Sequence, residues 1–156
     1  MIYVWVAVHL VVFTIVYSIG EWYIHRHWMH KPGKVEYYHP HHVEHHGMDR
    51  QETEHVDLHW TLALSTWFYT SPVWAIITIS TGQFYTALAW LAWLLACMWL
   101  WSHCHRHMHD EKRSRWVEWL PFYWPMLRHH LKHHDRPNRN LGALFIFSDY
   151  FFKTKV

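Results

Sequence analysis

The chain has 156 residues, enough for one domain, and its composition is unusual, with 19 histidines, 13 tryptophans and 51% hydrophobic residues. A formal net charge of +2 excludes a strongly basic nucleic-acid-binding protein. Cys97 and Cys104, seven residues apart on one predicted helix, lie about 10 Å from each other, which is too far for a disulfide. We therefore treat residues 1–156 as a single domain without disulfides.

Three segments that contain no Asp, Glu, Lys or Arg predict membrane-spanning helices. They cover residues 2–20, 60–80 and 83–102, and each has the roughly 20 residues that a helix needs to cross a bilayer core of about 30 Å. The first segment lacks the basic start and the small-residue cleavage site of a signal peptide, so we expect a retained anchor. The predicted fold is an all-α integral membrane protein with about three to four transmembrane helices.

The basic residues indicate which way the predicted spans run. All 14 Lys and Arg residues lie within residues 26–50 and 106–155. By the positive-inside rule both stretches are cytoplasmic, which places the N-terminus on the opposite side of the membrane. The two stretches then form a cytoplasmic helical cap.

Four histidine clusters fall in this cap or at the predicted cytoplasmic ends of the spans. In chain order they are IHRHWMH (24–30), HPHHVEHH (39–46), SHCHRHMHD (102–110) and RHHLKHHD (128–135). A lone histidine such as His9, inside the first span, is expected to be a packing residue. Because the topology brings all four clusters to one side of the membrane, we expect them to converge on one site.

The spacing within the clusters selects candidate ligands. Two copies of H-x-x-H-H and one pair four residues apart place their imidazoles on single helix faces. His25 and His30 are five residues apart, a poorer fit to one face, so we expect them to reach different metals. The predicted ligands are His25, His30, His42, His45, His46, His103, His107, His130, His133 and His134.

So many imidazoles indicate a redox metal site with more than one ion. Neutral imidazole suits iron, copper, nickel and zinc, and ten ligands exceed what one metal needs. Iron fits best, because it changes oxidation state and can leave a coordination position open for O2. Zinc binds such ligands at least as well, so a recombinant sample can carry zinc. A pH sensor or a loose metal buffer would have irregular spacing.

Polar residues beside the clusters are candidates for orienting the imidazole rings. They are Glu44, Asp110, Asp135 and Asn140, which could accept hydrogen bonds from imidazole N–H groups. The alternative is that these side chains are merely solvated at the surface.

The order of the histidine motifs resembles that of the fatty acid hydroxylase and sterol desaturase superfamily of integral-membrane di-iron proteins. The resemblance runs from residue 21 to residue 154 and includes the tail NRNLGALFIFSDYFFKT. It implies O2-dependent hydroxylation of an unactivated C–H bond in a lipid, with two iron ions as cofactors and O2 as co-substrate. No electron-carrier domain fits in this length, so a separate ferredoxin- or cytochrome-type donor is implied.

The sequence also departs from the family pattern. A second pair, His105 and His109, overlaps the third motif about 200° around the helix, and we favour the first pair. The closing glycine of the family tail is Lys153 here. The segment E-x-V-D-L (54–58) is similar to bacterial carotenoid hydroxylases, so a carotenoid hydroxylase or a lipid desaturase stays open.

Two functions from other classes also stay open. One is a membrane metal-binding protein without oxygenase activity, although the predicted spans carry no carboxylate to line a transport path. The other is a zinc hydrolase, which needs a general base that Glu44 or Glu54 could provide.

Overall fold

All regular secondary structure in the described part of the chain is helical. The computed structural model describes residues 2–33, 38, 41, 42, 45, 46, 71, 72, 74–76, 78–80, 82, 85–109 and 114–156. The elements are α1 (Ile2–Ile24), the π-helix η1 (His25–Met29), α4 (Thr86–His109), the 3-10 helix η4 (Arg115–Trp119), α5 (Tyr123–Asp135) and α6 (Phe147–Phe151). This agrees with the predicted all-α class for the residues concerned.

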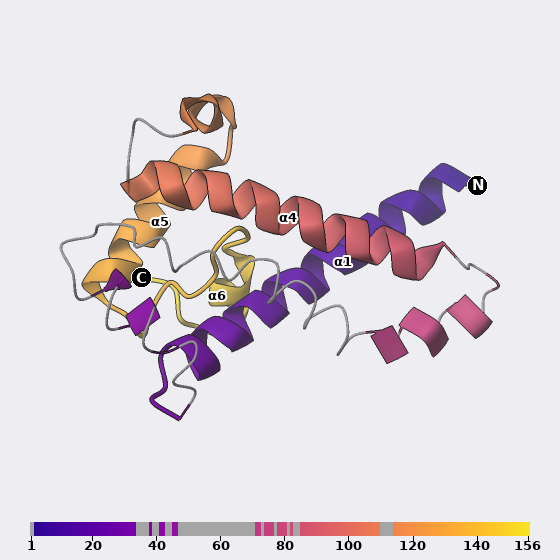
Figure 1. Ribbon diagram of the computed structural model, residues 1–156, viewed down its shortest axis with the longest axis horizontal. Coiled ribbons are helices and arrows are strands. Elements are labelled where there is room, and N and C mark those ends of the chain that lie inside the picture. The colour runs from indigo at the N-terminus through magenta and orange to yellow at the C-terminus, as the bar shows by residue number, and fades with distance from the viewer. Residues whose placement is uncertain are drawn as a thin grey trace.

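Two long helices, α1 and α4, form the body of the molecule. Between Ala87 and His109, α4 contains neither glycine nor proline and is rich in Ala and Leu, which favours a continuous helix. Figure 1 shows both helices running in the same direction, so that their histidine-bearing C-terminal ends lie at the end of the molecule away from the N-terminus. The fold thus brings the first and third histidine clusters to the same end.

An aromatic cluster joins the two helices. Phe13 of α1 packs edge-on against Trp74, with ring centroids 4.8 Å apart, and lies 5.1 Å from the ring of Trp90 on α4. The outward faces are also apolar: Val11 is 59% exposed and Leu88 68%. Exposed apolar side chains of this kind are expected where a helix faces lipid rather than water.

One helical stretch of the described residues, Ala7–Met29, is long and apolar enough to cross a membrane by length and composition. The predicted span over 83–102 falls on α4, which continues into the histidines of its last two turns. The predicted span over 60–80 lies mostly outside the described residues. The number of three to four spans therefore stays a prediction.

The C-terminal part of the chain docks back onto α1. Glu21 on α1 accepts hydrogen bonds from the backbone amides of Ala143, at 2.9 Å, and Leu144, at 3.1 Å. The indole N–H of Trp22 donates to Thr154 Oγ1 at 2.9 Å. These bonds fix the tail against the end of α1, and the tail in turn positions α5 beside η1.

Candidate metal centre

Eight histidines from distant parts of the chain form two compact groups. In each group, one ring nitrogen from every histidine lies within 4.8 Å of the others. The first group is His25, His30, His41 and His133, and the second is His45, His105, His109 and His130. Each group therefore has the size and the donors of a metal site.

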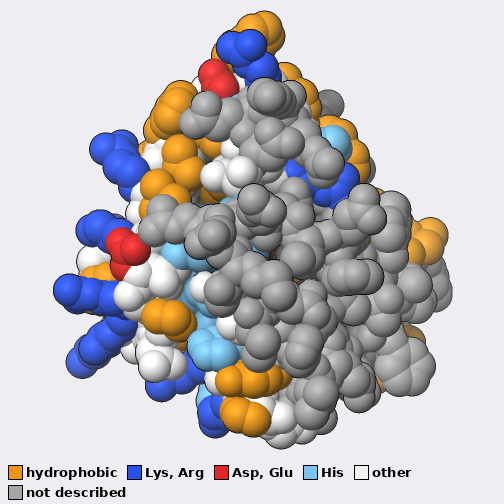
Figure 2. All heavy atoms as spheres, turned by 60° about the vertical axis from the view of Figure 1, so that its left-hand side comes forward, with side chains coloured by type: hydrophobic (Ala, Val, Ile, Leu, Met, Phe, Trp, Pro, Cys, Tyr) orange, Lys and Arg blue, Asp and Glu red, His pale blue; other side chains and the backbone are white. Residues whose placement is uncertain are grey.

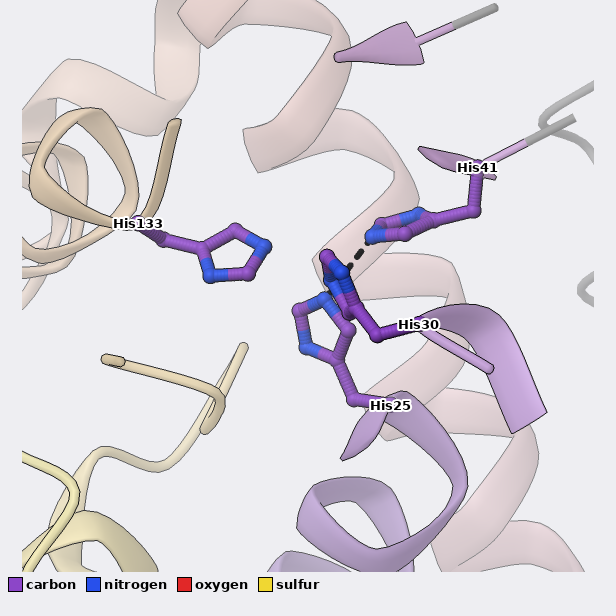
Figure 3. Close-up of side chains that lie close together, drawn as sticks. All are labelled: His25, His30, His41 and His133. Carbon is purple, nitrogen blue, oxygen red and sulfur yellow. Dashed lines mark hydrogen bonds between the residues drawn. The ribbon is translucent and has the colours of Figure 1, made fainter. Parts of the chain in front are cut away.

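The first group combines three histidines from residues 25–41 with one histidine from α5, about 100 residues later in the chain. In Figure 3, His25 and His30 come from η1, His133 faces them from α5, and His41 closes the third side. The Nε2 atoms of His25 and His41 are 2.8 Å apart, and the rings of His25 and His133 have centroids 4.4 Å apart. Four imidazoles thus converge on one point.

The second group lies between α4 and α5. The Nε2 atoms of His109 and His130 are 2.9 Å apart, and those of His45 and His105 are 3.3 Å apart. His134, one turn after His130 on α5, also brings its Nε2 within 3.0 Å of His130 Nε2. His134 can therefore complete this group.

His46 connects the two groups. Its ring centroid lies 4.7 Å from that of His133 in the first group and 4.6 Å from that of His134 beside the second. Both ring nitrogens of His46 are buried, and no described residue forms a hydrogen bond with either of them. The two groups therefore form one continuous array rather than two remote sites. His42 adjoins the array, with its Nδ1 3.1 Å from Nδ1 of His30.

Two π-turns explain why histidines five residues apart share a group. In an α-helix, residues five apart point about 140° away from each other, whereas a π-turn spans five residues. His25 is the first residue of the π-helix η1 and His30 follows its last, and the His46 amide donates to the carbonyl of His41 at 3.2 Å. The ring centroids are 5.0 Å apart in both pairs. The expectation that His25 and His30 reach different metals is therefore corrected, since they lie in the same group.

The π-turn between His41 and His46 also places His41 in the first group, although His41 was not among the predicted ligands. The α-helical spacing selected His42, but the π-turn places His41 in the first group and leaves His42 stacked on Tyr38. The five-residue interval from His41 to His46 repeats the interval from His25 to His30, and this repeat was the available signal.

The third cluster contributes its second pair, not the favoured first one. His105 and His109 point into the array, whereas His103 Nδ1 lies 2.7 Å from Ser114 Oγ and His107 Nε2 lies 2.8 Å from Glu118 Oε1. The two pairs lie on opposite faces of α4, and of the two only the face of His105 and His109 borders the array, whereas the ring of His107 lies 5.5 Å from that of Tyr123 at the start of α5. The other face is covered by η4 and the residue before it, a packing partner that spacing does not reveal.

Burial keeps the array in the protonation state that metals bind. Burial, reinforced by neighbouring imidazoles, lowers the pKa of His30 to about 3 and that of His45 to about 2. Burial also lowers the pKa of His133 to about 4. The rings are therefore neutral at pH 7, and a neutral imidazole has the free lone pair that a metal ligand needs.

Backbone carbonyls fix which nitrogen of two rings carries that lone pair. Because a carbonyl oxygen can only accept, His25 Nδ1–H donates to Leu141, at 2.6 Å, and His133 Nδ1–H donates to Arg139, at 2.8 Å. In the neutral ring each Nε2 is then the acceptor, and both point into the first group. Such hydrogen bonds are the usual way in which proteins orient metal-binding histidines.

The unsatisfied ring nitrogens test whether a metal fits. Several lie buried without a hydrogen-bond partner among the described residues: His30 Nε2, His45 Nδ1, both nitrogens of His46, and His133 Nε2. Each such atom costs about 1–3 kcal/mol when left unpaired. Cations placed among them would satisfy the nitrogens that face the array. The residues fit metals that prefer nitrogen ligands, and in the described part of the chain both groups consist only of histidines.

The family model described as fatty acid hydroxylase matches residues 10–154. The chain belongs to the fatty acid hydroxylase family. This confirms the resemblance inferred from the order of the histidine motifs, and the family is one of membrane-associated oxidoreductases that typically depend on iron. No curated protein and no solved structure matches the chain.

In this member of the fatty acid hydroxylase family, the carboxylate that organises the site is one that spacing did not select. Asp149 is fully buried and accepts hydrogen bonds from the amides of Leu141, at 2.8 Å, and Gly142, at 2.6 Å. It also accepts from Thr154 Oγ1 and from His129 Nε2, at 2.5 and 2.9 Å. Burial alone would raise the pKa of Asp149, but these hydrogen bonds together lower it. A charged Asp149 thus holds the loop that carries the Leu141 carbonyl.

Of the four residues expected to orient the rings, the structure describes Asn140 and Asp135. Asn140 Nδ2 donates to the backbone carbonyl of His129, and its Oδ1 accepts from the amide of Val156, so Asn140 binds the tail rather than an imidazole. Asp135 is exposed at the end of α5. Glu44 and Asp110 lie outside the described residues. Glu21, which accepts hydrogen bonds from the tail, was not among the predicted residues. It is the only carboxylate in the otherwise uncharged segment 2–25, and an isolated carboxylate of this kind is typical of a buried hydrogen-bond acceptor.

Proposed function

We propose that the protein is a membrane di-iron oxygenase that uses O2 to hydroxylate an unactivated C–H bond of a lipid. The observation that carries the proposal is the pair of adjacent groups of four histidine nitrogens, each within 4.8 Å. Two all-nitrogen groups in contact favour two redox metals over one structural zinc, which usually has four ligands and often includes cysteine.

The chain's own residues would hold and orient the metals. His25, His30, His41 and His133 would bind one ion, and His45, His105, His109 and His130 the other, with His46 and His134 close to both. Two iron ions, when bound, would supply the activation of O2 that amino-acid side chains cannot provide. The carbonyls of Leu141 and Arg139 keep two Nε2 lone pairs aimed inward, and burial keeps the rings neutral.

The lipid would approach from the membrane that the apolar helices cross. The predicted topology has three spans, with the N-terminus outside and the histidine clusters cytoplasmic. The parallel course of α1 and α4 in Figure 1 supports the part of this topology in which the first and third spans run the same way. Their exposed faces are apolar up to the turns that precede the array, so a lipid chain beside them would end near the metals.

A zinc hydrolase would need a general base beside the metal. Neither histidine group contains a carboxylate among the described residues, and Glu44 and Glu54, the bases that the sequence offers, lie outside them. Glu118, which is described, is bonded to His107 on the opposite face of α4. The origin of the oxygen atom in the product therefore decides between an oxygenase and a hydrolase. A carotenoid hydroxylase or a lipid desaturase would use the same centre, and product analysis distinguishes them.

The first experiment is metal analysis of detergent-purified protein from iron-supplemented cells. We expect about two irons per chain, and His133→Ala should lower the content while the matched variant His103→Ala leaves it unchanged. Equal metal content in both variants, or one metal or none in the wild type, would argue against a dinuclear centre.

The second experiment follows oxygen from O2 into lipid. Cells expressing the protein are grown under ¹⁸O2, and extracted lipids are analysed by mass spectrometry. A hydroxylase gives an alcohol that contains ¹⁸O, a desaturase gives a double bond without ¹⁸O, and a hydrolase takes its oxygen from water. Products that depend on His133 but lack ¹⁸O would exclude the hydroxylase.

A further inference from the structure

A basic surface lies directly over the first histidine group. Between residues 114 and 156 there are seven Lys and Arg residues against three acidic ones, and one of these three, Asp149, is fully buried. Five of the cations are exposed on the last turns of α5 and the segments that follow it: Lys132, Arg136, Arg139, Lys153 and Lys155. Figure 2 shows Lys and Arg side chains gathered along one side of this end of the molecule, next to histidines. We call these five residues the basic face.

Hydrogen bonds hold the basic face together across three segments. Arg139 Nη1 donates to the carbonyl of Lys153 at 2.9 Å, and Lys132 Nζ donates to the carbonyl of Val156 at 3.3 Å. The amide of Asn140 also donates to the carbonyl of Thr154 at 3.0 Å. The cations are therefore positioned by the fold and do not belong to a loose tail.

The basic face is connected to the histidine array by one hydrogen bond. Arg139 is exposed, yet its carbonyl accepts from Nδ1 of His133, whose ring is completely buried in the first group. An electron that arrives at the backbone of Arg139 would have only this bond and one imidazole to cross. The basic face is thus a surface with a short bonded route to the proposed metals.

We propose that the basic face is the docking site of an acidic one-electron carrier protein. This inference rests on the proposed function. Hydroxylation places one oxygen atom of O2 in the alcohol and the other in water, and it consumes two protons and two electrons besides the C–H substrate. A one-electron carrier must therefore dock and be oxidised twice per turnover, and complementary charge is what makes repeated, short-lived encounters fast.

The composition of the face favours a protein over a bilayer surface as its occupant. A segment that inserts into the headgroup region combines cations with exposed large apolar side chains. From Pro125 to Ile146, the described chain exposes no large apolar side chain, whereas Lys132, Arg136 and Arg139 all lie there and are exposed. The exposed aromatic residues Tyr150 and Phe151 adjoin the other edge of the face, where Lys155 Nζ lies 3.8 Å from the centroid of the Tyr150 ring, and they belong to α6, which packs on α1. The part of the face formed by Lys132, Arg136 and Arg139 therefore carries the comparison.

The test measures how fast iron-loaded full-length protein oxidises a reduced acidic [2Fe–2S] ferredoxin. The variant Lys132→Glu/Arg136→Glu reverses two cations of the basic face, and Arg115→Glu reverses an exposed cation on η4 as the matched control. We expect the double variant to lower the second-order rate at least tenfold at low ionic strength and to remove most of its salt dependence. Arg115→Glu should keep the wild-type rate.

Reduction by dithionite separates the two proposals. This small reductant needs no docking, so the double variant and the wild type should be reduced by it at the same rate and with the same iron content. If ferredoxin oxidation is equally fast in the double variant, the basic face is not the docking site. If the double variant instead loses only its binding to phosphatidylserine vesicles, the face binds lipid headgroups and the inference is wrong. If dithionite does not reduce even the wild type, it is the proposed redox centre that fails.

Discussion

His25 and Leu141 are 116 residues apart in the chain, yet Nδ1–H of His25 donates a 2.6 Å hydrogen bond to the carbonyl oxygen of Leu141. The amide of the same Leu141 donates to Asp149, as does the amide of Gly142. One short loop is therefore clamped by a buried carboxylate on its N–H side and orients an imidazole on its carbonyl side. The strength of this clamp, and its effect on the histidine groups, can be tested by substitution.

Gly142→Ala should loosen the loop and the first histidine group together. A Cβ at this position would lie 2.7 Å from the carbonyl oxygen of Phe145, 2.8 Å from Asp149 Oδ2 and 2.9 Å from Ser148 Oγ. Relieving such contacts costs about 1–3 kcal/mol of unfolding free energy. Thermal unfolding should show the loss, and metal analysis should show weaker retention. Gly33→Ala is the control, because nothing lies within 4 Å of its added Cβ. Equal effects of the two substitutions would contradict the clamp.

Lys153→Gly should stabilise the protein. The backbone of Lys153 has a φ of 55°, in the left-handed region that costs a side-chain-bearing residue about 1–2 kcal/mol. Glycine avoids this cost but adds entropy to the unfolded chain, so the net gain should be about 0.5–1 kcal/mol. The control Lys153→Ala removes the same charge and keeps the strained backbone. A gain in melting temperature for both variants would show that charge, not backbone conformation, is responsible.

His109→Ala and His107→Ala should separate the two faces of α4. His109 belongs to the second group, so its loss should reduce the metal content by up to one ion per chain. His107 bonds to Glu118, so its loss should lower stability but leave the metal content near the wild-type value. Elemental analysis of both variants, purified side by side, tests this. The assignment of the faces is wrong if the order is reversed.

The metal-free protein should lose stability as the pH falls below about 6.5. An unfolded histidine has a pKa of 6.5, whereas burial lowers the pKa of His30, His45 and His133 to about 3, 2 and 4 in the fold. Between these values the unfolded chain binds more protons, so acid favours unfolding. Asp149 acts in the same direction at lower pH, because its pKa is also lowered. Denaturant unfolding from pH 7.5 to 4.5 should show a steep decline, and a flat profile would contradict buried neutral rings.

Much of the site could be predicted from spacing alone. The clusters that meet, the family and the neutral imidazole chemistry all follow from histidine intervals at the ends of uncharged helices. The structure groups His41 rather than His42 with the first histidines, because the chain makes a π-turn where an α-helical period was assumed. It groups His105 and His109 rather than His103 and His107, and spacing could not distinguish these pairs because two faces of one helix are equivalent until the position of a neighbour, here η4, is known.

The supporting residues were harder to predict for a different reason. Glu21, Asp149 and the carbonyls of Leu141 and Arg139 act through backbone groups, which leave no pattern in a sequence. The tail was part of the family resemblance, but its function as the clamp depends on long-range hydrogen bonds. Lys153 adopts a left-handed backbone, with a φ of 55°, at the place where the resemblance to the family predicts a glycine.

The docking of the tail on α1 sets an order of events during synthesis. His25 leaves the ribosome long before Leu141 and Asp149 exist to orient it, and the last bond of the clamp requires Thr154. While α1 is being synthesised, its histidines therefore have neither a fixed tautomer nor their partner on α5. Under the proposed function, metal binding by the first group would follow the docking of the tail, and until then the histidines at the end of α1 would be open to adventitious metals.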